Sequence, residues 1–242
     1  MSLKSLKGCF IIVAHRGASG YEPENTLRSV RKALEMGVDA VEVDVRLSRD
    51  GVPVVIHDET VDRTTNGSGR VSDMTLKELK RLDAGAGEQI PLLEEVLEVV
   101  KGHAPLFAEI KELEVVKPSL GVVRKKEMLD DVLFISFYSE ALSVLRELEP
   151  AAHLGLIYAK PDNGIVGARK LGCEFVLPFY RLATEKAIAL AHRLKLGVVA
   201  WTVDELETAV ELKKHGVDGV ASNYPDRLFP LRDTSVARRR IG

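Results

Sequence analysis

The chain has little of what disulfide-stabilised proteins depend on. It contains only two cysteines, Cys9 and Cys173, which lie far apart and each adjoin an apolar run. Two distant cysteines offer neither a disulfide framework nor the close spacing of a zinc site. We therefore expect both to be small core residues in a reducing compartment.

The chain also has little excess of positive or negative charge. The 34 basic and 36 acidic side chains leave a formal net charge of −2. Proteins that bind nucleic acid or an anionic membrane usually carry a basic excess, so neither partner is expected. Three consecutive arginines at 238–240 are expected to be a solvated end of the chain.

No apolar run is long. The first, Cys9–Ala14, has six residues, which is shorter than the apolar part of a secretion signal, and no small-residue cleavage site follows it. A helix needs about 20 apolar residues in succession to span a bilayer, and no stretch of the chain provides them. We expect a cytoplasmic protein with no membrane span, and its oligomeric state stays open.

What the chain does contain is a regular series of eight short apolar runs, most of them rich in Val, Ile and Phe. They are Phe10–Ala14, Ala40–Val45, Leu106–Ile110, Val132–Phe137, His153–Tyr158, Glu174–Leu177, Gly197–Trp201 and Asp218–Ala221. Each is typical of a buried parallel strand. Amphipathic segments separate them, for example one that Asn25 can cap and Gly37 can end, and one that Pro91 opens.

Eight strands alternating with helices predict a (β/α)8 TIM barrel, and 242 residues suit a single domain over 1–242. The alternative is an open, doubly wound sheet. That fold would need a glycine-rich phosphate loop after the first strand, and Gly-x-Gly-x-x-Gly is absent.

One segment interrupts the alternation. After the second strand, Asp50-Gly51 predicts a hairpin turn, and Pro53–Ile56 predicts an extra strand. Residues 59–90 then form a polar, glycine-containing insertion, in which Thr75-Leu76-Lys77-Glu78 is a capping box for a short helix. We expect this insertion to lie over the mouth of the barrel.

Polar side chains gather where the predicted strands end, which is where barrel enzymes place their reactive groups. They are His15, Arg16, Glu42, Asp44, Glu109, Lys111 and Trp201. A buried carboxylate needs a partner, and a divalent cation would supply one to Glu42, Asp44 and Glu109. An oxygen-only ligand set favours Mg²⁺, Ca²⁺ or Mn²⁺ over Zn²⁺.

The hairpin is expected to bring a second histidine to this cluster. With a two-residue turn at Asp50-Gly51, residue 44 pairs with residue 57, so His57 would lie beside Asp44 on the same face. His15 and His57 would then flank the metal, one accepting a proton and the other donating one. Arg16 offers a planar fork for phosphate, and Lys111 a point charge. These are the groups needed to displace an alcohol from a phosphodiester.

The same residues belong to longer motifs. The motifs are His15-Arg16-Gly17, Pro23-Glu24-Asn25-Thr26, Glu42-Val43-Asp44-Val45, His57-Asp58, Ile90-Pro91, Glu109-Ile110-Lys111, Trp201-Thr202-Val203 and Gly216-Val217-Asp218-Gly219-Val220. In these motifs the chain resembles the glycerophosphodiester phosphodiesterase family over nearly its whole length. The resemblance implies a metal-dependent hydrolase that releases glycerol 3-phosphate and an alcohol, with the site residues already named in the same roles. It also implies that Glu24 and Asn25 shape the site, whereas helix capping is the other interpretation of Asn25.

The chain departs from the family pattern after the last strand. Members of the family often carry Thr-Asp before Tyr-Pro, and this chain has Ser222-Asn223. Any role of that aspartate charge is therefore expected to be absent. The segment after Lys111 is also short, which predicts an open site with loose selectivity for the alcohol.

Two other functions compete with this one. A phospholipase C-like or lysophospholipase D-like enzyme would need an apolar groove at the mouth, which Phe137, Tyr138, Phe179 and Tyr180 could form. A barrel that binds a phosphorylated ligand without turnover is the second, and the complete set of histidines and carboxylates argues against it.

A glycerophosphodiester also carries a hydroxyl next to the esterified carbon. Intramolecular attack by that hydroxyl avoids the entropy cost of capturing water. We therefore expect a cyclic phosphate to form and then to be opened by water, with the two histidines exchanging roles.

Overall fold

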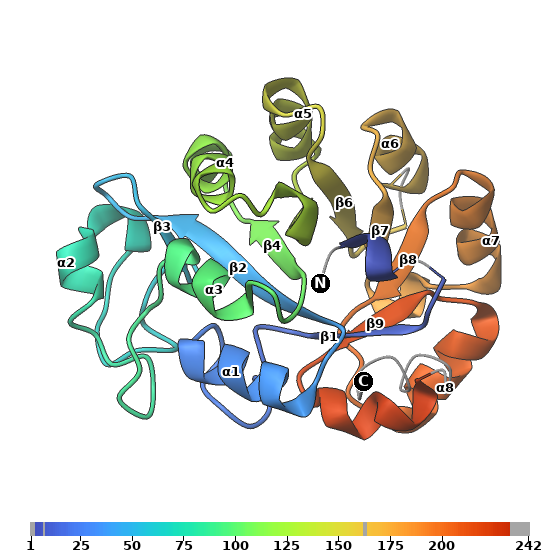
Figure 1. Cartoon of the computed structure of the whole chain (residues 1–242), viewed down its shortest axis with the longest axis horizontal. Helices are drawn as coiled ribbons and strands as arrows, with labels where there is room; N and C mark the ends of the chain where they lie inside the picture. Colours follow the sequence, from blue (N-terminus) through green and yellow to red (C-terminus); the bar gives the residue numbers. More distant parts are fainter. Residues whose placement is uncertain (1–2, 7, 162–163, 233–242) are drawn as a thin grey trace.

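The computed structural model describes residues 3–6, 8–161 and 164–232, so the arginine run at 238–240 lies outside the described residues. Eight parallel strands form a closed barrel with helices around it (Figure 1). In spatial order they are β1 (Ile11–Ala14), β2 (Ala40–Leu47), β4 (Leu106–Ile110), β5 (Val132–Ser136), β6 (His153–Tyr158), β7 (Phe175–Pro178), β8 (Gly197–Ala200) and β9 (Gly219–Ser222). Because β1 pairs with both β2 and β9, the predicted (β/α)8 barrel is confirmed and the open sheet is excluded.

The outer helices are α1 (Leu27–Met36), α3 (Leu93–Val100), α4 (Val116–Lys125), α5 (Ser139–Leu148), α6 (Gly164–Lys170), α7 (Glu185–Arg193) and α8 (Leu206–His215). The prediction that Asn25 caps α1 is wrong. Thr26 is the cap, and its Oγ1 accepts a hydrogen bond from the backbone N–H of Ser29 at 3.2 Å. Gly37 ends the helix as predicted, in a left-handed conformation with φ 75°. No helix among the described residues has the length and the apolar character that crossing a bilayer requires.

The strands alternate between two cores. Inward side chains such as Ile11, Phe107 and Leu177 fill the barrel, and outward ones pack against the helices. Leu3 and Leu6, on a short 3-10 segment (Leu3–Leu6), pack against the barrel interior near the beginnings of the strands. The barrel is therefore closed at that end, and its functional groups lie at the other. Of the two cysteines, Cys173 is buried as predicted, but Cys9 is half-exposed.

The predicted extra strand is β3 (Pro53–Val55), which pairs antiparallel with β2. Its register differs by one residue from the prediction. Val45 faces Val55 and Leu47 faces Pro53, so Asp44 faces residue 56 rather than His57. The loop consequently holds three residues, 49–51. A hydrogen bond from the backbone N–H of Ser48 to the carbonyl oxygen of Val52, 3.0 Å long, closes it. His57 reaches the strand ends because β3 stops at Val55 and the chain leaves the sheet.

The insertion that follows has a small core of its own. The core consists of Val54, Ile56, Val61, Val71, Leu79, Ala84 and Ile90. Its helix α2 (Leu76–Leu79) begins at the predicted capping box, in which Thr75 and Glu78 bond each other's backbone N–H. In Figure 1 the insertion projects beside β2 and α3, outside the ring of helices.

Candidate active site

Most of the predicted site residues converge at the carboxyl ends of the strands. His15 and Arg16 follow β1, while Glu42 and Asp44 lie on β2. Glu109 is the penultimate residue of β4 and Lys111 comes just after it; Trp201 follows β8. Six of the eight predicted site residues, His57 and Trp201 among them, line one cavity of about 140 Å³.

The three carboxylates of Glu42, Asp44 and Glu109 form a buried acidic cluster. Each contributes one carboxylate oxygen, and these three oxygens lie within 4.8 Å of one another. Burial and the charges of Asp44 and Glu109 raise the pKa of Glu42 well above its usual range. Burial and the charge of Asp44 likewise raise the pKa of Glu109 to about 7, against the opposing charge of Lys111. Burial would also raise the pKa of Asp44, but Lys111 and Arg16 outweigh it and lower that pKa to about 2.

The acidic cluster fits a divalent cation. Glu42 Oε1 is buried and has no hydrogen-bond partner among the described residues. A buried carboxylate oxygen without a partner is costly, and a hard cation relieves this cost through oxygen ligands. The observation supports a metal site without identifying the ion.

Arg16 and Lys111 lie against the acidic cluster. Lys111 Nζ is 2.7 Å from Glu109 Oε1 and 3.3 Å from Asp44 Oδ1, and Arg16 Nε is 3.3 Å from Asp44 Oδ2. Arg16 has a left-handed backbone with φ 56°, which turns its N–H toward Glu42 Oε2 at 2.8 Å. Asn25 also binds Asp44, since its Nδ2 donates to Oδ2 at 2.8 Å. Of the two interpretations of Asn25, the structure favours support of the site.

His15 is held from behind by the turn after β9. Its Nδ1 lies 2.8 Å from Asn223 Oδ1, and its Nε2 lies 3.9 Å from Glu42 Oε2. Burial and the charge of Arg16 lower the pKa of His15. This chain has Asn223 where members of the family often carry an aspartate. A different aspartate, Asp204, lies beside it, and Asn223 Nδ2 donates to Asp204 Oδ2 at 2.8 Å.

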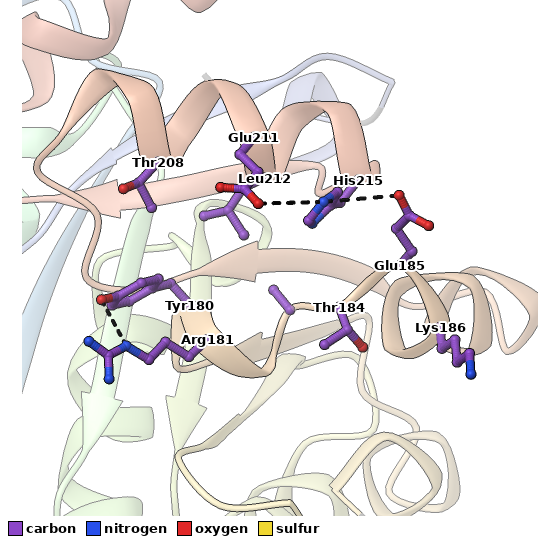
Figure 2. A pocket seen from close by; sticks show the side chains of 10 residues that line it. Tyr180, Arg181, Thr184, Glu185, Lys186, Thr208, Glu211, Leu212 and His215 are labelled. Atoms are coloured by element: carbon purple, nitrogen blue, oxygen red, sulfur yellow. Dashed lines mark hydrogen bonds and ion pairs between the residues drawn. The ribbon is translucent and has the colours of Figure 1, made fainter.

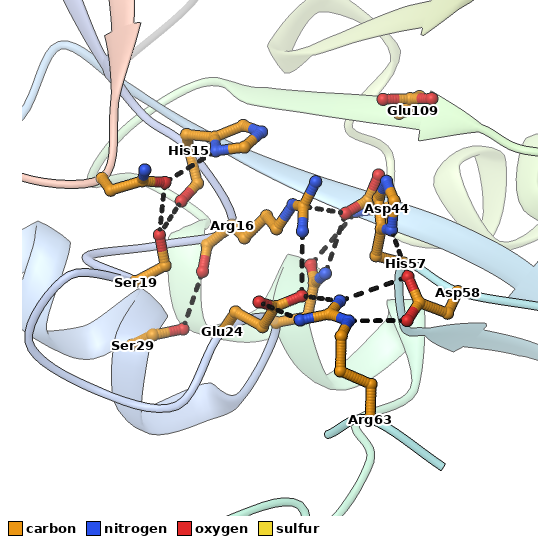
Figure 3. Close-up of polar contacts among 12 residues, drawn as sticks. His15, Arg16, Ser19, Glu24, Ser29, Asp44, His57, Asp58, Arg63 and Glu109 are labelled. Atoms are coloured by element: carbon orange, nitrogen blue, oxygen red, sulfur yellow. Dashed lines mark hydrogen bonds and ion pairs between the residues drawn. The ribbon is translucent and has the colours of Figure 1, made fainter. Parts of the chain in front are cut away.

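His57 is held by a carboxylate. Its Nδ1 lies 2.5 Å from Asp58 Oδ1, and burial lowers the pKa of His57 despite the charge of Asp44 and the hydrogen bond with Asp58. Arg63, from the insertion, binds Asp58 through Nε at 2.6 Å and Glu24 through both terminal nitrogens at 2.7 and 2.9 Å. Figure 3 shows Arg63 lying between these two carboxylates, with Glu24 in turn reaching Arg16.

Aromatic side chains form one wall of the cavity. Trp201 donates its indole N–H to the carbonyl of Leu177 at 2.8 Å, and its ring meets Phe137 and Phe179 edge to face. Phe137 and Tyr138 remain 40% and 59% exposed, so this wall continues to the surface. The hydrogen bond fixes the indole as a flat apolar surface beside the acidic cluster.

A larger cleft of about 620 Å³ lies on the outside of the barrel, between α7 and α8 (Figure 2). Its ionic contacts join His215 Nε2 to Glu185 and Glu211, each at 4.0 Å. Both glutamates are mostly exposed, and contacts of this kind contribute little. Among the described residues, this cleft has no cluster of buried charged side chains like the one at the strand ends. The strand ends are therefore the better candidate for the site.

Sequence reasoning did not assign roles to Arg63, Asn223 and Asp204. Arg63 lies in a loop whose path could not be read from the sequence, and the other two lie just beyond strands. The position of Asp204, four residues after the end of β8, was the one available signal. Four histidines were expected to be structural or surface residues, and none of them lines the cavity at the strand ends. They are His103, His153, His192 and His215.

Comparison with known proteins agrees with this geometry. Residues 15–227 match the model of the glycerophosphoryl diester phosphodiesterase family. A glycerophosphodiester phosphodiesterase of Caldanaerobacter subterraneus is 36% identical over 91% of this chain and 97% of its own length. One of Bacillus subtilis is 32% identical over 92% and 86%. The structure of an Oleispira antarctica phosphodiesterase with its product sn-glycerol-3-phosphate superposes with a TM-score of 0.88, at 32% identity, covering 92% of this chain and 96% of that one.

Proposed function

Because this chain belongs to the glycerophosphoryl diester phosphodiesterase family, whose members are phosphoric diester hydrolases, we propose that it hydrolyses glycerophosphodiesters to glycerol 3-phosphate and an alcohol. The observation that carries the proposal is one cavity lined by two histidines, by Arg16 and by two glutamates of the acidic cluster, with Lys111 held against that cluster. The product bound to the Oleispira antarctica relative supports the same chemistry.

In this proposal His15 and His57 move the protons. Each imidazole has its Nδ1 bonded to a neighbour, which leaves Nε2 available to the cavity. One accepts the proton of the attacking hydroxyl and the other protonates the departing alcohol. Arg16 and Lys111, already held at the rim of the acidic cluster, bind the phosphate oxygens, and Trp201 packs against the apolar part of the substrate.

A divalent cation, Mg²⁺ or Ca²⁺ and alternatively Mn²⁺, would be held by Glu42, Asp44 and Glu109. When bound it supplies positive charge that stabilises the phosphate oxygens. The hydroxyl next to the esterified carbon is the proposed nucleophile, so a cyclic phosphate precedes the final product.

Turnover of glycerophosphocholine tests the proposal, with Mg²⁺, with Ca²⁺ and with a chelator. We expect turnover that requires the cation and is far slower for the 2-deoxy analogue, with binding of both measured separately. Equal rates for the two substrates would exclude the cyclic phosphate and leave attack by water. Absence of turnover with every cation would reject the function itself.

The exposed aromatic wall favours one alternative, a lysophospholipase D-like activity. Phe137 and Tyr138 offer apolar surface where an acyl chain could lie. Assays with lysophospholipid and with bis(p-nitrophenyl) phosphate separate the cases. A preference for lysophospholipid over glycerophosphocholine would favour the lipid substrate, and cleavage of the nitrophenyl ester alone would indicate a less specific phosphodiesterase.

A further inference from the structure

A short chain of hydrogen bonds runs from the turns after β8 and β9 to the ring of His15. Asp204 accepts hydrogen bonds from Asn223 twice, from its backbone N–H and from its Nδ2, both at 2.8 Å. Ser222 Oγ donates to the same carboxylate at 3.0 Å. On its other side, Asn223 presents Oδ1 to His15 Nδ1 at 2.8 Å. The three side chains are thus linked in the order Asp204, Asn223, His15.

We propose that Asp204 and Asn223 are positioning residues that hold neutral His15 in the tautomer protonated on Nδ1. An ionised aspartate can only accept hydrogen bonds, so the NH₂ group of Asn223 must face Asp204. The amide oxygen of Asn223 then faces His15, and an oxygen acceptor requires a proton on the facing ring nitrogen.

The neighbouring Ser19 does not overturn this orientation. Its Oγ lies 2.7 Å from the carbonyl oxygen of His15 and 2.8 Å from Asn223 Oδ1, and its single hydrogen serves one of them at a time. Rotating the amide would let Asn223 donate to Ser19. The rotated amide would, however, set two oxygens against each other at Asp204 and lose a hydrogen bond to a charged group, which is the stronger kind.

The tautomer decides which ring nitrogen can accept a proton from the cavity. With the hydrogen on Nδ1, the lone pair is on Nε2, and this atom lies on the side of Glu42. The reverse tautomer would direct an N–H toward the acidic cluster and a lone pair toward Asn223. The catalytic value of this arrangement rests on the proposed function, whereas the tautomer itself depends only on the hydrogen bonds.

The first test measures the tautomer directly. In protein labelled with nitrogen-15 at histidine, long-range proton–nitrogen spectra at about pH 8, above the ordinary histidine pKa, distinguish a protonated ring nitrogen from a bare one. The spectrum of His15→Gln identifies the signals of His15. We expect a protonated Nδ1 in the natural protein and a mixed population in Asp204→Asn. A protonated Nε2 in the natural protein, or an unchanged spectrum in Asp204→Asn, would overturn the proposal.

The second test exchanges the two groups. Asp204→Asn should lower kcat about 10–100-fold, the usual effect of losing an orienting partner, with KM little changed. Asn223→Asp places two carboxylates in contact and should lower kcat at least as far. The double variant Asp204→Asn with Asn223→Asp restores one carboxylate and one amide, and it should recover most of the lost kcat. Failure of this rescue in folded protein contradicts the proposal.

The matched control is Asp226→Asn. It removes a carboxylate that Tyr21 binds through its hydroxyl at 2.9 Å, in the segment after the same strand, and it should leave kcat and the His15 signals unchanged. If the natural protein cleaves no glycerophosphodiester, the proposed function fails. The tautomer spectra still decide the positioning role in that case.

Discussion

The Nδ1 atoms of His15 and His57 contact different kinds of hydrogen-bond acceptor. The acceptor at His15 is an amide oxygen, and the acceptor at His57 is the carboxylate of Asp58. Arg63 keeps that carboxylate ionised, because its hydrogen bonds hold the pKa of Asp58 well below the ordinary range. The two imidazoles therefore line the same cavity with different hydrogen-bond partners at Nδ1.

Replacing either histidine should abolish most turnover without unfolding the protein. His15→Ala and His57→Ala each remove a group that transfers a proton in the proposed mechanism, and such groups contribute about 10²–10⁴-fold to the rate. The check is kcat on glycerophosphocholine, with thermal unfolding as the measure of folding. His103→Ala, on an exposed residue, is the control. A near-natural rate in either variant would remove that histidine from the mechanism.

Arg63→Met should impair catalysis although Arg63 touches neither the acidic cluster nor the cavity wall. The substitution leaves Asp58 and Glu24 without their shared cation, so both His57 and Arg16 lose a fixed partner. We expect kcat/KM to fall about 10–100-fold, as for other residues that orient site groups. Arg70→Met is the control, since Arg70 lies exposed in the same insertion and binds Glu59 at 3.0 Å. Equal effects of the two substitutions would contradict this role.

The groups on and beside barrel strands could be predicted from the sequence, and the groups that orient them could not. Glu42, Asp44 and Glu109 are polar residues within apolar strands, where alternation fixes the face that they occupy. Arg63 and Asp204 reach the site from irregular segments. Their positions depend on how those segments pack, which no periodic pattern encodes.

At the scale of elements, the hairpin between β2 and β3 marks a limit of sequence reasoning. Asp50-Gly51 is typical of a two-residue turn, yet the loop has one residue more. Ser48 Oγ donates to Asp50 Oδ1 at 2.7 Å and accepts from the N–H of Val52 at 3.0 Å. Asp50 Oδ1 also accepts from the N–H of Leu76, which begins α2, at 2.9 Å. The insertion therefore helps to set the register, and this contact could not be read from the turn alone.

The strands also depend on glycines that leave room inside the barrel. A Cβ on Gly219 would lie 2.3 Å from Ile11 Cγ1 and 2.5 Å from the Ile11 carbonyl oxygen. Because the backbone of β1 cannot move aside cheaply, Gly219→Ala should destabilise the protein by roughly 1–3 kcal/mol, or more, as overpacking does. Urea unfolding measures this change.

The matched substitution is Gly121→Ala, on the exposed side of α4, where an added Cβ meets nothing within 4 Å. It should instead stabilise the protein by about 0.5–1 kcal/mol, since alanine favours the helix. If Gly219→Ala proves as stable as Gly121→Ala, the close contact with β1 is not rigid.

At the scale of the whole molecule, the acidic cluster links stability to pH. Between the ordinary glutamate pKa and the value of about 7 at Glu109, this carboxyl group holds more protons in the folded protein than in the unfolded chain. The contribution of Glu109 to the free energy of unfolding should therefore fall as pH rises through this window when no cation is present, whereas the lowered pKa values of His15 and His57 act in the opposite direction. The raised pKa of Glu42 acts in the same direction as that of Glu109.

A divalent cation held by the acidic cluster, as proposed, should reverse that loss, because it would bind the deprotonated carboxylates. The rise in Tm that Mg²⁺ or Ca²⁺ produces over chelator-treated protein is expected to be larger at about pH 8 than at about pH 6. The double variant Glu42→Gln with Glu109→Gln should show little response to either. A cation effect that is independent of pH would argue against these two glutamates as ligands.

The packing of Leu3 and Leu6 against the barrel interior has a consequence for the order of events in turnover. Leu3 and Leu6 are buried with the interior side chains of the barrel, so we expect reactant and product to use the same entrance at the strand ends. In the proposed reaction, a molecule of glycerol 3-phosphate that has not yet left would occupy the space that the next diester must enter. The enzyme should therefore be slowed by its own phosphorylated product, and the inhibition should be competitive, vanishing when the diester is in large excess.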